Sequence, residues 1–66
     1  MKVKINGTVK EIDEGATLEG LLDLFGIKRQ GIAVELNREI VPKRAHGQTL
    51  LKDGDAVEVV RMAGGG

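Results

Sequence analysis

The chain contains no cysteine, and this absence removes several classes of site at once. Disulfide bonds, thiolate metal sites and a cysteine nucleophile are all excluded. Small secreted domains usually depend on disulfides, so we expect a cytoplasmic protein. No apolar run is long enough for a signal peptide or a membrane span. We therefore expect a soluble protein that has no membrane partner.

Aromatic residues and net charge are also scarce. Phe25 is the only aromatic residue, and ten basic residues balance ten acidic ones. Binding to nucleic acid requires an excess of Lys and Arg, and unpaired bases need aromatic side chains on which to stack. A nucleic-acid partner is therefore not expected. With 66 residues, 41% of them hydrophobic, the chain should form one small domain with little room for an enclosed active site.

The first part of the sequence predicts a β-hairpin. Residues 2–5 alternate polar and apolar side chains, as in a half-buried strand. Asn6-Gly7 follows, and this pair favours a two-residue turn because both central positions need a positive φ. Residues 8–12 then form the returning strand, although Ile12 is out of phase with Val9, which indicates a bulge or an early strand end.

A single helix is predicted after the hairpin. Thr17 is the expected N-cap, and Gly26 is the expected stop. The apolar residues between them have the i, i+3, i+4, i+7 spacing of one helical face: Leu18, Leu21, Leu22 and Phe25. We interpret this face as part of the core rather than as a binding groove, because few other residues could form a core.

The remainder of the chain returns to strands. Alternation predicts a strand over 32–36, a short strand at Ile40-Val41 that Pro42 ends, an irregular segment over 43–49 and a final strand over 56–62. The fold class is therefore α+β, with a mixed sheet of four to five strands around one helix. The residues expected to be buried are Ile5, Leu21, Leu22, Phe25, Val34, Leu36, Val57 and Val59.

Two features could suggest a metal site but have simpler explanations. Asp53-Gly54-Asp55 has the composition of a turn, and two carboxylates do not make a coordination set. His46 has no cysteine or second histidine to act with, so we interpret it as a packing or surface residue. No metal or cofactor is expected to bind this chain.

The carboxyl-terminal Gly64-Gly65-Gly66 is the least ordinary feature. At average glycine usage, three terminal glycines arise by chance in roughly one chain in 3,000. A frayed end or an expression scar is the simple explanation. The functional alternative is a flexible tail, residues 63–66, that follows a folded domain, residues 1–62. The segment from Arg61 to Gly66 would reach about 20 Å when extended, and glycines could pass through a narrow channel.

Such a tail would bring a carboxylate to another protein's active site. A carboxylate is a poor electrophile, but attack on the α-phosphorus of ATP would give an acyl-adenylate that a sulfur or nitrogen nucleophile can open. The sequence has no phosphate-binding loop, so the partner must hold the nucleotide. Val60 and Met62, on the opposite face of the last strand from Val57 and Val59, are the expected docking residues.

The order of these motifs resembles the thiamin-biosynthesis sulfur carriers, the ThiS family, nearly from end to end. The similar segments are Asn6-Gly7, Gly15-x-Thr17-Leu18-x-x-Leu21-Leu22, Ile32-Ala33-Val34-x-Leu36-Asn37-x-Glu39-Ile40-Val41-Pro42, Lys52-Asp53-Gly54-Asp55 and the terminal glycines. The chain departs from the family pattern in ending with three glycines rather than two, and in carrying His46 where some relatives have an aromatic residue.

The resemblance implies a ubiquitin-like β-grasp fold and a carrier rather than an enzyme. It implies that Gly66 is adenylated and converted to a thiocarboxylate, and that Gly64 and Gly65 form the narrow conduit of backbone that leads to it. The implied partners are an E1-like adenylyltransferase that uses ATP and Mg²⁺, a sulfur donor such as a cysteine desulfurase system, and a thiazole synthase. When free, the chain is expected to be a monomer.

Other functions remain open. The small subunit of molybdopterin synthase is similar in fold and chemistry but usually has Phe-Pro-Pro before its glycines, where this chain has residues 59–63 as Val-Val-Arg-Met-Ala. Carriers for tRNA thiolation or cysteine synthesis, and a protein-conjugating modifier, are further alternatives. A β-grasp interaction module without terminal chemistry belongs to a different class, and blocking the C-terminus would distinguish it from a carrier.

Overall fold

The computed structural model describes residues 1–62, so the predictions for residues 63–66 lie outside the described residues. The strands and the α-helix within that range follow one another in the order predicted, and a 3₁₀ helix is added where an irregular segment was expected. The elements are β1 (Lys2–Ile5), β2 (Thr8–Glu11), α1 (Leu18–Leu24), β3 (Ile32–Leu36), β4 (Glu39–Ile40), the 3₁₀ helix η1 (Lys43–Gln48) and β5 (Ala56–Arg61). Neither helix is long and apolar enough to cross a lipid bilayer.

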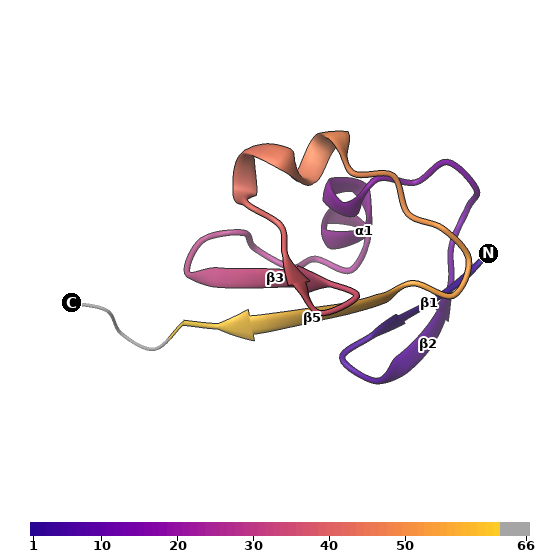
Figure 1. Cartoon of the computed structure of the whole chain (residues 1–66), viewed down its shortest axis with the longest axis horizontal. Coiled ribbons are helices and arrows are strands. Elements are labelled where there is room, and N and C mark those ends of the chain that lie inside the picture. Colours follow the sequence, from indigo (N-terminus) through magenta and orange to yellow (C-terminus); the bar gives the residue numbers. More distant parts are fainter. Residues whose placement is uncertain (63–66) are drawn as a thin grey trace.

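The five strands form one sheet in the order β2-β1-β5-β3-β4. β1 and β5 run parallel, and the other neighbouring pairs are antiparallel. Both helices lie over the same face of this sheet, and β5 runs through its middle (Figure 1). The predicted α+β class and the mixed sheet around one α-helix are therefore confirmed.

Two tight turns set the register of the outer strands. Asn6 and Gly7 have φ values of 48° and 85°, which confirms the predicted turn between β1 and β2. Asn37 and Arg38 have φ values of 52° and 73°, so the β3–β4 connection has the same left-handed form. This backbone favours asparagine and glycine but is uncommon for arginine, and its twist matches that of the flanking strands.

The helix α1 begins and ends close to the predicted residues. Thr17 is its N-cap, and the Thr17 hydroxyl oxygen accepts a hydrogen bond of 3.1 Å from the backbone N–H of Gly20. Gly26, with φ 68°, follows the last turn. Leu18, Leu21 and Leu22 are all at most 1% exposed. This face of the helix is therefore core, as predicted.

The prediction that Phe25 is buried is wrong. Its side chain is 38% exposed. The helix ends at Leu24, and Phe25 is the C-cap with φ −98° and ψ 12°, so its side chain no longer follows the helical repeat toward the sheet. The Phe25 ring instead lies 5.5 Å from the Lys10 ammonium, measured to the ring centroid.

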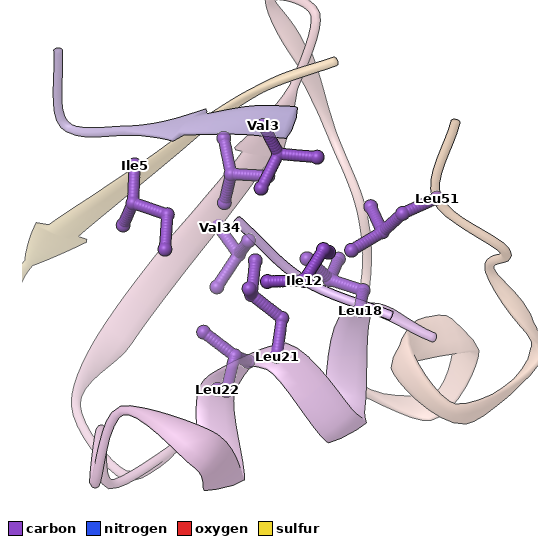
Figure 2. Packing of buried hydrophobic residues seen from close by; sticks show 9 residues of the cluster. Val3, Ile5, Ile12, Leu18, Leu21, Leu22, Val34 and Leu51 are labelled. Atoms are coloured by element: carbon purple, nitrogen blue, oxygen red, sulfur yellow. The ribbon is translucent and has the colours of Figure 1, made fainter. Parts of the chain in front are cut away.

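The core lies between α1 and the sheet, and Figure 2 shows side chains from both elements meeting there. The buried apolar residues are Val3, Ile5, Ile12, Leu18, Leu21, Leu22, Val34, Leu51 and Val57. Leu36 and Val59, predicted as buried, are only partly buried against this cluster. The predicted core lacked Val3, Ile12 and Leu51. Because β2 ends at Glu11, Ile12 turns inward, which explains its irregular phase.

The segment predicted as irregular contains the 3₁₀ helix η1. Pro42 precedes it, and the Pro42 carbonyl accepts from the Ala45 N–H at 2.8 Å. His46 is 4% exposed, with Nε2 lying 3.0 Å from the Val41 carbonyl oxygen, so it is a packing residue. The two last strands are also slightly shifted from the prediction, since β4 is Glu39–Ile40 and β5 ends at Arg61.

Candidate functional site

The start of β5 is held by a buried carboxylate. Asp55 is 7% exposed and accepts hydrogen bonds from the Lys52 backbone N–H at 2.7 Å and from the Asn37 side-chain amide at 3.0 Å. The Asn37 side-chain oxygen accepts in turn from the Ala56 N–H at 2.9 Å. The predicted turn at 53–55 is thus confirmed, and Asp55 fixes the point where β5 begins.

The middle of β5 is held by the side chain of Asn6. The Asn6 backbone N–H donates to the Val57 carbonyl at 2.9 Å, and the Asn6 side-chain oxygen accepts from the Val59 N–H at 2.8 Å. Sequence reasoning interpreted Asn6 only as a turn residue. Nothing near Asn6 in the sequence indicates a bond to a residue 53 positions away, so this positioning role was missed.

The two faces of β5 differ in burial. Val57 is 1% exposed and Val59 is partly buried, and both face the core. Val60 and Met62 are 49% and 61% exposed. Val60 lies directly across from Ala33 of β3 on the outer face of the sheet. The exposure expected for the docking residues is therefore found, while their docking role stays a prediction.

Charged residues border these apolar side chains on the outer face. Glu58 lies directly across from Glu35, an arrangement in which like charges repel. Neither carboxylate takes part in an ion pair among residues 1–62. A shallow hollow of about 230 Å³ beside them is lined in part by Lys4 and Arg38, whose positive charges offset the carboxylates.

One hollow in the described part of the chain lies beyond the end of α1 and is not a promising anion site. It measures about 490 Å³ and is lined by residues that include Arg29, Lys28 and Lys43. The Arg29 guanidinium is already 3.1 Å from the Glu19 carboxylate and 3.4 Å from that of Asp23. Among residues 1–62, no group of three potential ligands could hold a metal ion.

This arrangement is suited to holding the C-terminal end of β5 in a fixed position where a partner protein can reach it. β5 is fixed at Asp55 and Asn6 and then continues beyond the β1–β2 hairpin toward the C-terminal end (Figure 1). Its last described residues expose Val60 and Met62 immediately before the glycine-rich end of the sequence. Gly64, Gly65 and Gly66 lie outside the described residues, so their roles as conduit and attachment site stay predictions.

Comparison with solved structures supports the same reading of the fold. A crystal structure described as the thiamine biosynthesis protein ThiS from Geobacter metallireducens superposes with a TM-score of 0.87 at 35% sequence identity, covering all of both chains. A solution structure of a thiamine biosynthesis protein from the same organism has a TM-score of 0.77, covering all of this chain and 88% of that one. The mixed sheet around one helix is therefore the β-grasp fold that these proteins share.

Sequence comparisons lead to the same group. A thiazole synthase of Paramagnetospirillum magneticum is 42% identical over the whole chain, which spans only 20% of that relative. The sulfur carrier protein ThiS of Thermus thermophilus is 41% identical over 69 residues, covering 97% of this chain and 98% of the relative. The family model described as the ThiS family matches residues 3–66. The chain therefore belongs to the ThiS family.

Proposed function

We propose that this chain is a sulfur carrier of thiamin biosynthesis that works as a substrate of its partners and not as a catalyst. The observation that carries the proposal is the anchored strand β5, at whose end two exposed apolar residues, Val60 and Met62, come shortly before Gly64-Gly65-Gly66. The family membership and the name of the Thermus thermophilus relative support it.

The chemistry takes place on the Gly66 carboxylate. An oxygen of this carboxylate attacks the α-phosphorus of ATP, and pyrophosphate leaves. Hydrosulfide then attacks the acyl carbon of the adenylate, and AMP leaves with the bonding electrons. Loss of the proton from the thioacid gives a thiocarboxylate, in which sulfur replaces one oxygen of the original carboxylate. The partner supplies the ATP and Mg²⁺ site, and side-chain-free Gly64 and Gly65 allow the backbone to approach it closely.

The proposed partners follow from this chemistry. An E1-like adenylyltransferase activates Gly66, and a cysteine desulfurase system supplies the sulfur. A thiazole synthase receives it, and this assignment is supported by relatives named thiazole synthase in which a segment like this chain forms a fifth of the protein. Thiamin biosynthesis is therefore preferred over the molybdopterin, tRNA and cysteine pathways.

The direct test uses the full chain with the purified E1-like adenylyltransferase of the same organism, ATP, Mg²⁺ and inorganic sulfide. We expect an intact-mass gain that corresponds to replacement of one oxygen by sulfur, and fragmentation should place it on Gly66. Omission of ATP is the control. A mass gain on an internal residue, or none with an adenylyltransferase that is active on another carrier, would contradict the proposal.

Substitutions on the outer face test how the adenylyltransferase docks. Val60→Asp and Met62→Asp should each raise KM for the carrier by about tenfold or more, because a buried apolar anchor is replaced by a charge. Val9→Asp is the matched control, since Val9 is 53% exposed on the distant strand β2. The thermal midpoint should shift equally little in all three variants. An unchanged KM for both test variants would remove the docking assignment.

A further inference from the structure

Within residues 1–62, the last residues of β5 have a neighbouring strand on one side only. β1 pairs with β5 through just two positions, Lys4 with Ala56 and Ile5 with Val57. On the other side, β3 accompanies β5 as far as Arg61. Figure 1 shows β5 continuing past the β1–β2 hairpin. Beyond Val57, the side of β5 that faces away from β3 is therefore an edge of the sheet.

The hydrogen bonds to β3 show which backbone groups point toward that edge. The Asn37 N–H donates to the Ala56 carbonyl at 2.8 Å, and the Met62 N–H donates to the Gly31 carbonyl at 2.8 Å. Antiparallel partners alternate between hydrogen-bonded and non-bonded pairs, so the even-numbered residues of β5 bond to β3. The odd-numbered residues, Val57, Val59 and Arg61, direct their N–H and C=O groups the opposite way.

Among residues 1–62, the outward-facing N–H and C=O groups nearer the start of β5 have hydrogen-bond partners, and those at its end have none. Asn6 bonds to the Val57 carbonyl and to the Val59 N–H. Among residues 1–62, nothing donates to the carbonyls of Val59 and Arg61 or accepts from the Arg61 N–H. These three groups form an acceptor–donor–acceptor row, which is the pattern that an added β-strand recognises. We call this row the β5 edge.

We propose that an extended segment of the adenylyltransferase adds to the β5 edge as a further strand when it takes up the tail. This inference rests on the proposed function. The β5 edge ends at Arg61, two residues before the segment 63–66 that must enter the enzyme. A protein that encloses those residues therefore lies close to this edge, and main-chain hydrogen bonds there would set the direction in which the tail enters.

A second copy of the chain fits the β5 edge poorly. Antiparallel self-pairing centred on Val60 would use the Val59 N–H, which Asn6 already holds, so only two hydrogen bonds would form. Self-pairing centred on Arg61 would set two guanidinium groups directly opposite each other, which is unfavourable. A partner segment with its own sequence meets neither obstacle.

The outer edge of β2 offers a control within the same sheet. The Ile12 N–H donates to the Met1 carbonyl at 2.8 Å, and the alternation along the β1–β2 ladder then points the Val9 N–H away from β1. Val9 is thus a second edge residue, but β1 separates it from β5.

Amide hydrogen exchange of the full chain, free and saturated with the adenylyltransferase without ATP, tests the proposal directly. In the free chain, the Arg61 amide should exchange rapidly and the Met62 amide slowly. In the complex, exchange at Arg61 should slow by about tenfold or more, as for an amide that gains a partner, while Val9 stays unchanged. An equal exchange rate of the Arg61 amide in both states overturns the proposal. A slower exchange rate of this amide in the free chain at high protein concentration also overturns it, because it would indicate self-pairing.

A pair of substitutions separates the backbone from the side chain. Arg61→Pro removes the edge N–H, whereas Arg61→Ala keeps it. The proline variant should raise KM for adenylation by about tenfold relative to the alanine variant, because a hydrogen bond is lost and the ring obstructs the added strand. Val9→Pro should leave KM unchanged. Protection of the Met62 amide in each variant checks that β5 remains paired with β3.

The outcomes distinguish this proposal from the function on which it rests. If the unmodified chain is not adenylated at all, the proposed function fails and the β5 edge proposal falls with it. If the unmodified chain is adenylated and Arg61→Pro matches Arg61→Ala, only the β5 edge proposal is wrong.

Discussion

Deleting Gly65 and Gly66 should leave the thermal midpoint of the protein unchanged and abolish its adenylation. The buried apolar cluster is formed by residues between Val3 and Val57, so the fold does not depend on the deleted residues for its core. Glycine has no side chain to bury and loses the most backbone entropy on ordering, so its removal costs the folded state little. Thermal unfolding and pyrophosphate release with the adenylyltransferase measure the two effects.

Substitutions at Gly65 give a graded version of the same test. Gly65→Val should lower kcat/KM by about a hundredfold or more. A β-branched side chain restricts the backbone dihedral angles and adds bulk where the tail has to approach the enzyme closely. Gly65→Ala is the matched control and should have a smaller effect. If the truncated chain is still adenylated, or if valine is tolerated as well as alanine, these glycines are not the conduit.

Leu22→Ala should destabilise the domain severely. Leu22 is completely buried between α1 and the sheet, as Figure 2 shows, and loss of such a side chain costs about 2–5 kcal/mol. A domain of this size has a free energy of unfolding of only about 3–10 kcal/mol. We therefore expect a thermal midpoint at least about 8 °C lower, measured by circular dichroism.

Two neighbouring residues on α1 and its cap provide the comparison. Leu24 is 65% exposed, so Leu24→Ala should change the free energy of unfolding by at most about 0.5 kcal/mol. Phe25 is partly exposed, and Phe25→Ala should cost less than about 2 kcal/mol, below the range for a buried aromatic residue. If Phe25→Ala proved as damaging as Leu22→Ala, the described orientation of the Phe25 side chain would be wrong.

Turns and helices could be predicted from the sequence where they depend on the conformational preferences and spacing of neighbouring residues. Asn6-Gly7 needs only its own backbone preferences to form a left-handed turn, and the spacing of Leu18, Leu21 and Leu22 indicates a helical face without knowledge of the sheet. The same approach failed at Phe25, because the pattern continues one residue beyond the point where the helix ends. It also missed η1, whose sequence has no apolar period and whose His46 is buried by its surroundings.

The sequence by itself determined the order of elements, the turns, most of the core and the glycine-rich segment that carries the proposed chemistry. Each of these depends on residues a few positions apart. The tertiary structure alone decided how β5 is held and where it becomes an edge. The Asn6 side chain reaches Val59 only because β1 and β5 lie side by side. Among residues 1–62, the Arg61 N–H has no partner because β1 pairs with β5 only as far as Val57, whereas β3 pairs with it as far as Arg61. The contacts between β1 and β5 join residues more than fifty positions apart, and the register of these strands is set by the packing of the whole sheet.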